Sequence, residues 1–226
     1  MKALLYKEFK LAMHPICYLF VIFFPLMVLI PGYPLAIGFI YVLTCYPILF
    51  LGANKGQQSN DLLFSTLLPV RKKDIVLARM ITVLILQVAF IAIQCLLFPL
   101  ALQFAKDMPA DGPKIPGIGL DGFVSVVSIA IVGYAIADIV FFPIYYHHGK
   151  SIVASTLLMI LGFVLYLAVF TIAIPYIPGC EGYLNFLSKS GVGVQFIVLA
   201  VALVISGVLH FFVYRISSKE LEKVDF

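Results

Sequence analysis

A single carboxylate, Asp138, stands inside a long apolar run. Ionisable groups in such a setting usually face a cavity, a pathway or a partner. Gln87 and Gln94 lie seven residues apart in another apolar run, so they share one face of a helix and are expected to face protein rather than lipid. Two interpretations stay open: a substrate or proton pathway, or a hydrogen-bonded tie between helices, with Tyr134, one turn before Asp138, as a candidate partner.

Three other groups resemble reactive sites only superficially. The stretch Gly149 to Ser151 lacks the glycine that a phosphate-binding loop needs five residues earlier, where Ile144 stands. His147 and His148 are adjacent in a tight turn with no carboxylate nearby in sequence, so we do not expect a metal pair. His210, near the end of an apolar run, is expected to reach toward the membrane interface. We therefore expect no catalytic residue and no metal site.

The composition is that of a membrane protein. Of 226 residues, 63% are hydrophobic and only 12% are charged, with a mean hydropathy of +1.11, whereas a soluble domain has about 25% charged residues. The net charge of +4 leaves no soluble basic face for nucleic acid. The four cysteines share no ligand-like or disulfide-like spacing and are expected to be small apolar fillers.

The apolar runs predict an all-α, polytopic fold: one membrane domain over residues 1–226. Six transmembrane helices are expected, at about 15–30, 35–53, 75–104, 122–146, 152–174 and 192–214. Pro25 and Pro47 are expected to kink the first two spans. Residues 1–13 predict an amphipathic helix at the interface, with one apolar and one basic face: Leu5, Phe9, Ala12 and Ile16 against Lys7, Lys10 and His14.

The basic residues predict the orientation. Six spans put both termini on one side, and with that side cytoplasmic all but three of the 15 basic residues are inside, the exceptions being Lys106, Lys114 and Lys189. We therefore expect a multi-pass protein with cytoplasmic termini.

The segment 54–74 is the most polar part of the chain, yet its middle is amphipathic. Asn60 can cap a short helix and Pro69 ends it, while Asp74 is expected to cap the following span. One stripe of this helix carries Leu62, Leu63, Thr66 and Leu67. A two-faced helix between spans two and three favours docking to a cytoplasmic partner, although a loop that only fixes topology is the simpler alternative.

Three stretches carry a resemblance to a known family: MKALLYKEFK at the N-terminus, TLLPVRKKDIVLAR before the third span and FFPIYYHHGKS after the fourth. Together the chain resembles the small six-span permease subunits of ABC-type exporters, of the type-2 class, over essentially its whole length. The family often has acidic residues before the second stretch, whereas this chain reads NKGQQSND, so a detail of the docking contact is expected to differ.

The resemblance implies that the short helix is a coupling helix inserted into a separate ATP-binding subunit, which would carry ATP and magnesium. The residues expected to couple are Asp61, Leu62, Leu63, Thr66, Leu67, Leu68, Pro69 and Arg71. It also implies a second permease chain and a bacterial cytoplasmic membrane, with peptides or hydrophobic small molecules as substrates. Two alternatives stay open: an ion-coupled carrier that uses Asp138, and a non-transporting immunity or anchor subunit.

Overall fold

The computed structural model describes residues 2–12, 15–29, 69–106, 123–148, 152–169 and 192–223, and nearly all of these are helical, with no strand among them. The elements in chain order are α1 (Lys2–Lys7), η1 (Glu8–Ala12), α2 (Pro15–Phe23), η2 (Phe24–Leu29), α5 (Lys72–Lys106), α6 (Phe123–His148), α7 (Ile152–Ala168) and α10 (Val192–Lys223). The expected all-α class is therefore confirmed for these residues.

Three helices are long and apolar enough to cross a membrane: Lys72–Ala101, Val126–His147 and Gln195–Lys223. A fourth span results if the N-terminal helices, Lys2–Lys10 and Pro15–Met27, count as one element with a bend of 82°. The shorter apolar helix α7 runs from Ile152 to Ala168, and residues 170–174 of the predicted span lie outside the described residues. The predicted span 35–53 lies outside the described residues, so the structure supports three or four spans among those it describes.

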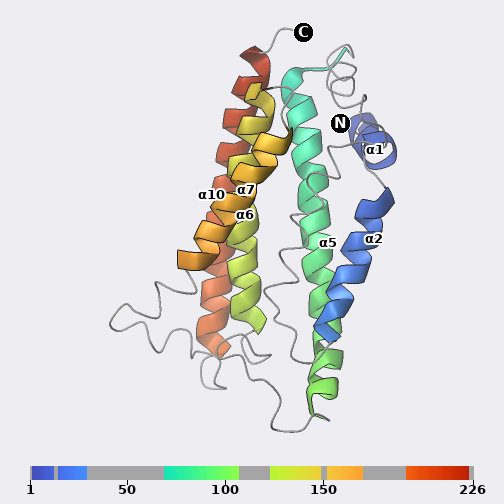
Figure 1. Cartoon of the computed structure of the whole chain (residues 1–226), viewed down its shortest axis with the longest axis vertical. Coiled ribbons are helices and arrows are strands. Elements are labelled where there is room, and N and C mark those ends of the chain that lie inside the picture. The colour runs from blue at the N-terminus through green and yellow to red at the C-terminus, as the bar shows by residue number, and fades with distance from the viewer. Residues whose placement is uncertain are drawn as a thin grey trace.

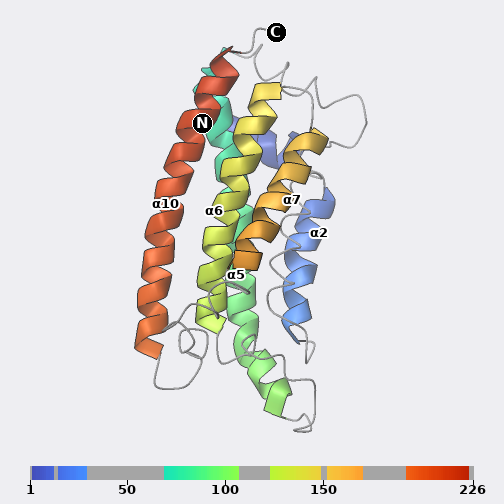
Figure 2. The same ribbon diagram turned by 60° about the vertical axis from the view of Figure 1, so that its left-hand side comes forward.

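Helix α6 lies at the centre of the described bundle. It packs against α10 on one side and α7 on the other, while α5 packs against α10, α2 and η2. Figure 2 shows α6 between α10 and α7, and Figure 1 shows α2 running beside α5. In their most apolar windows, 56% of the residues of α6 are buried but only 11% of those of α10. The outer face of α10 thus carries exposed aliphatic and aromatic side chains, as a lipid-facing helix requires.

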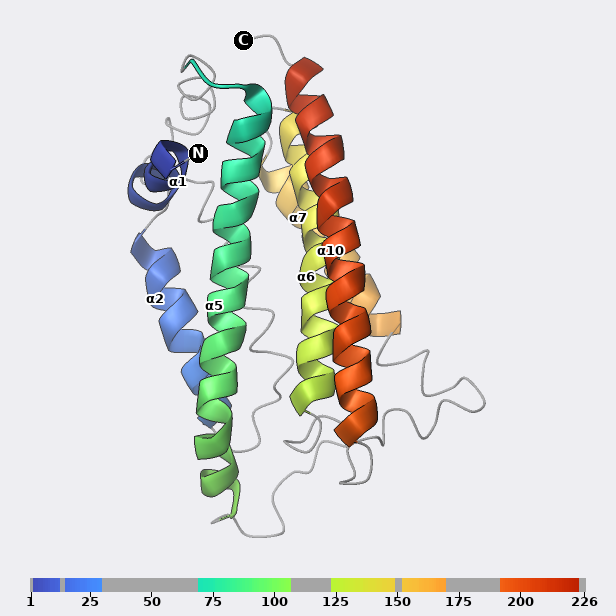
Figure 3. The same cartoon turned by 180° about the vertical axis from the view of Figure 1, so that it is seen from behind.

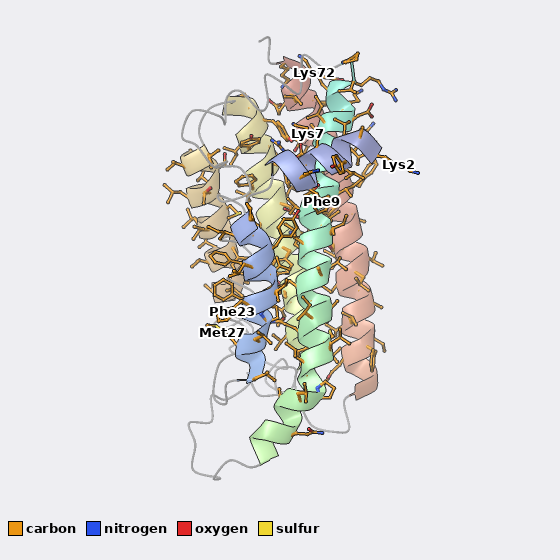
Figure 4. All side chains as sticks on the ribbon, turned by 90° about the vertical axis from the view of Figure 1, so that its right-hand side faces the viewer. Lys2, Lys7, Phe9, Phe23, Met27 and Lys72 are labelled. Carbon is orange, nitrogen blue, oxygen red and sulfur yellow. The ribbon has the colours of Figure 1, made fainter. Side chains whose placement is uncertain are left out.

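The N-terminal segment does not divide into faces as expected. Leu4 and Lys7 are buried, whereas Tyr6 and Ile16 are exposed. The predicted basic face was therefore wrong at Lys7, because Glu8 and helix α5 draw this side chain inward. Figure 4 shows α1 and η1 crossing α5 close to the end that carries Lys72.

Proline changes the helix type in the first span. The α-helix α2 ends at Phe23 and continues as the 3₁₀ segment η2, in which Pro25 is the second residue. Proline has no N–H to complete an i→i−4 bond, so the α-helical ladder cannot continue unbroken through it. The expected kink at Pro47 lies outside the described residues.

Candidate functional site

The described helices meet at one end in a group of charged contacts. Glu222 of α10 lies 3.2 Å from Lys73 of α5, and Glu220 lies 2.7 Å from His147 Nδ1 of α6. Figure 3 shows the start of α5 and the ends of α6 and α10 at this same end. The sequence suggested no carboxylate near His147, but Glu220 is 73 residues away and could not be seen as a neighbour. The described residues hold no group of three metal-ligating side chains.

The predicted coupling segment is only partly described. Asp61, Leu62, Leu63, Thr66, Leu67 and Leu68 lie outside the described residues, so their helix stays a prediction. Pro69 and Val70 are exposed, and the side chain of Arg71 is 85% exposed. Because α5 begins at Lys72, Asp74 stands in its first turn and not before it. Its expected role as the cap was therefore wrong. Its amide instead donates to the Arg71 carbonyl at 2.9 Å, and its carboxylate pairs with the Arg71 side chain at 3.3 Å.

The Asp138 carboxylate is buried where three helices converge, and one residue from each of the other two helices is hydrogen-bonded to it. Gln87 Nε2 of α5 lies 3.1 Å from Asp138 Oδ2, and His210 Nε2 of α10 lies 2.9 Å from the same oxygen. Asp138 is 1% exposed. The structure thus joins Asp138 to Gln87, and it adds His210, which sequence analysis placed at the interface. That expectation was wrong because the ring turns inward to reach the acid.

The hydrogen-bond geometry favours one tautomer of His210. His210 Nδ1 lies 2.7 Å from the Ser206 carbonyl oxygen, which only accepts, so this nitrogen carries a proton. The contact between Nε2 and Asp138 Oδ2 needs a second proton, on either the imidazole or the carboxyl. Either the imidazole or the carboxyl can be the donor in this contact.

Gln94 behaves differently from Gln87. It is 0% exposed, and neither atom of its side-chain amide has a hydrogen-bond partner within the part of the chain that the structure describes. Both glutamines face protein, as expected from their spacing. However, the structure does not bring Gln94 into contact with the Asp138 cluster, because seven residues separate it from Gln87 by about 10 Å along α5.

A second buried cluster was missed by the sequence analysis. Arg79 of α5 donates to the Glu8 carboxylate through Nε at 2.9 Å and through Nη2 at 3.2 Å. Arg79 Nη1 also lies 3.3 Å from the hydroxyl of Tyr145 of α6, and Lys7 Nζ lies 3.5 Å from Glu8. One signal was available, since Glu8 is the only acidic residue before Asp61. A lone carboxylate in a basic, apolar stretch needs a cationic partner.

Within the described ranges the helices are tied by polar side chains, and these residues form no constellation for covalent chemistry. A comparison with family models matches residues 3–218 to the ABC-2 family transporter protein. Neither the curated proteins nor the solved structures gave a match. This family is a membrane transport component that works with an ATP-binding subunit. Since the match covers nearly the whole chain, the protein belongs to the ABC-2 family of transporters and is a permease of an ABC transporter.

Proposed function

We propose that this chain is the membrane-spanning subunit of an ATP-driven exporter. It works with a separate ATP-binding subunit and a second permease chain, and it moves a peptide or a hydrophobic small molecule outward. ATP and magnesium are bound by the partner subunit. Both termini are cytoplasmic and the protein resides in a bacterial cytoplasmic membrane. The basic residues support this orientation, since Lys2, Lys7, Lys10 and Arg71 to Lys73 belong to the end where α1 meets the start of α5.

The observation that carries this proposal is the exposed segment from Pro69 to Arg71 that leads directly into α5. Helix α5 packs against α1, α2, η2 and α10. Any displacement of its first turn therefore reaches most of the described bundle. In this proposal residues 61–71 contact the ATP-binding subunit, with Asp61, Leu62, Leu63, Thr66, Leu67, Leu68 and Pro69 forming the contact and Arg71 adding charge.

The Asp138 cluster is proposed to be a tie between helices. The hydrogen bonds of Gln87 and His210 to one buried oxygen of Asp138 support this role, because they link α5, α6 and α10 at one level. The same contacts favour a second candidate function, an ion-coupled carrier. A histidine–carboxylate pair that shares a proton is a group that could exchange that proton across the membrane. A non-transporting immunity or anchor subunit is the remaining alternative.

The test is purification of the tagged chain from its native membrane in mild detergent, with its partners identified by mass. We expect a soluble ATP-binding subunit to co-purify, and to be lost when residues 60–71 are scrambled. The matched control is Val153→Ala in the exposed face of α7, which should keep the partner. A wild-type chain that purifies without any ATPase would refute the exporter and favour the carrier.

A further inference from the structure

The buried contact between Glu8 and Arg79 joins the N-terminal segment to a membrane-spanning helix. The guanidinium donates two parallel hydrogen bonds to the carboxylate, at 2.9 and 3.2 Å. Both residues are 5% exposed. Bidentate pairs of this kind fix the relative orientation of the two groups as well as their distance. Segment η1 therefore has a defined position and angle on α5.

Breaking a buried pair leaves a buried charge without compensation, which is far more costly than losing an exposed pair. Lys7 adds a second cation at 3.5 Å, so the carboxylate is shared by the segment's own lysine and by α5. Sliding η1 along α5 would leave one or more of these charges unpaired. The energetics therefore favour movement of η1 and α5 together.

The contact with α6 is weaker. Arg79 reaches the Tyr145 hydroxyl at 3.3 Å, and the hydroxyl is neutral. A hydrogen bond without an opposite charge contributes less than a bidentate ion pair. If α5 shifts against α6, the contact of Arg79 with Tyr145 is easier to break than the ion pair with Glu8, so η1 follows α5.

The pair also lies close to the segment that is proposed to contact the ATP-binding subunit. Arg79 lies about two turns into α5, roughly 10 Å from Lys72. On the other side, only two residues separate η1, which ends at Ala12, from α2, which begins at Pro15. A displacement of the start of α5 thus reaches the first membrane-spanning segment through Arg79 and Glu8.

We propose that Glu8 and Arg79 are positioning residues that make the N-terminal segment α1–η1 move as one body with α5. In this role the segment transmits motion to α2 and does not float independently in the interface. The proposal rests on the proposed function, since the motion is supplied by the ATP-binding subunit at residues 61–71.

The test measures distances by pulsed electron resonance in the full chain, purified with its ATP-binding subunit. Cys17, Cys45, Cys95 and Cys180 are first replaced by alanine, and spin labels are attached in pairs at three exposed positions: Lys2 of α1, Lys73 of α5 and Val153 of α7. Each pair is measured without nucleotide and with ATP, magnesium and vanadate.

We expect nucleotide to change both distances to Val153, the one from Lys73 and the one from Lys2. The distance from Lys2 to Lys73 should stay unchanged. In Glu8→Gln the distance from Lys73 to Val153 should still change with nucleotide, whereas the distance from Lys2 to Val153 should no longer change with it. The matched control is Lys10→Gln, since Lys10 is exposed on the same π-helical segment. It should behave as the wild type, and Arg79→Lys, which keeps the charge, should retain part of the joint shift.

A wild-type distance from Lys2 to Lys73 that changes with nucleotide would overturn the inference, even if Glu8→Gln were too unstable to measure. So would a Glu8→Gln protein in which Lys2 still follows Lys73, since the pair would then serve stability alone. An absent shift at Lys73 would also overturn it. Failure of the wild type to retain an ATP-binding subunit would instead refute the proposed function.

Discussion

Two substitutions of Asp138 distinguish the contribution of its hydrogen bonds to stability from the contribution of its charge. In Asp138→Leu, the donors of Gln87 and His210 lose an acceptor at 3.1 and 2.9 Å in a site that is 1% exposed. Each buried donor left without a partner costs about 1–3 kcal/mol, so the two together predict a loss of roughly 2–6 kcal/mol. Asp138→Asn has the same shape and keeps one acceptor oxygen, so it should cost about 1 kcal/mol.

The assay is thermal unfolding of the detergent-solubilised protein. For a chain of this size each kcal/mol corresponds to a shift of about 2–4 °C in Tm, so Asp138→Asn should lower Tm by about that amount and Asp138→Leu by roughly 5 °C or more. Replacing Asp138, Gln87 and His210 together by leucine should recover much of the loss, because no buried donor is then left unpaired. Equal Tm values for the Asn and Leu variants would refute this account of the site.

Transport measured on the same variants distinguishes the two interpretations of Asp138. If the residue is a tie between helices, Asp138→Asn should fold and keep transport close to that of the wild type. If the carboxylate exchanges a proton or contacts substrate, transport should be lost although Tm barely changes. The second outcome would favour the carrier over the proposed role.

Three further predictions concern packing, a buried amide and docking. Gly133→Ala places a methyl group 2.6 Å from a ring atom of α7 and should cost about 1–3 kcal/mol in unfolding experiments, whereas Gly207→Ala, with nothing within 4 Å, should be neutral or stabilising. Gln94→Leu removes a buried amide that has no partner among the described residues, so it should raise the free energy of unfolding by about 1–3 kcal/mol and thereby raise Tm. A lower Tm would show that the amide is hydrogen-bonded in the working protein. Charge reversal at Arg71 combined with Leu67→Asp should abolish co-purification of the ATP-binding subunit without lowering Tm, and an unchanged pull-down would count against docking at this segment.

Three of the predicted apolar spans coincide with long helices that the structure describes. The predicted spans 75–104, 122–146 and 192–214 each lie within or almost within one observed helix, because a long uncharged run has no stable alternative in lipid. Helix α10 continues past the predicted span to Lys223, and its last turns pair with the ends of α5 and α6.

The sequence identified Asp138 and Gln87 as members of one candidate site, but it did not predict that His210 contacts the carboxylate. His210 is 72 positions away, and Glu8 and Arg79 are separated by 71. Such pairings depend on which helices are neighbours and on how far each helix is shifted along its axis relative to the next. The periodicity within one helix determines neither. Lys7 shows the same limit, because its place on a helical wheel suggested solvent while its acidic neighbour is held inside the protein by α5.

The most direct test of docking is site-specific photo-crosslinking in native membranes. A benzophenone side chain is introduced at Arg71 and, as the control on the same helix axis, at Val88, which is 62% exposed and about 24 Å along α5 from Lys72. We predict an adduct with the ATP-binding subunit from position 71 and none from position 88. No adduct from position 71, or equal adducts from both positions, would contradict the claim that this segment couples the permease to ATP hydrolysis.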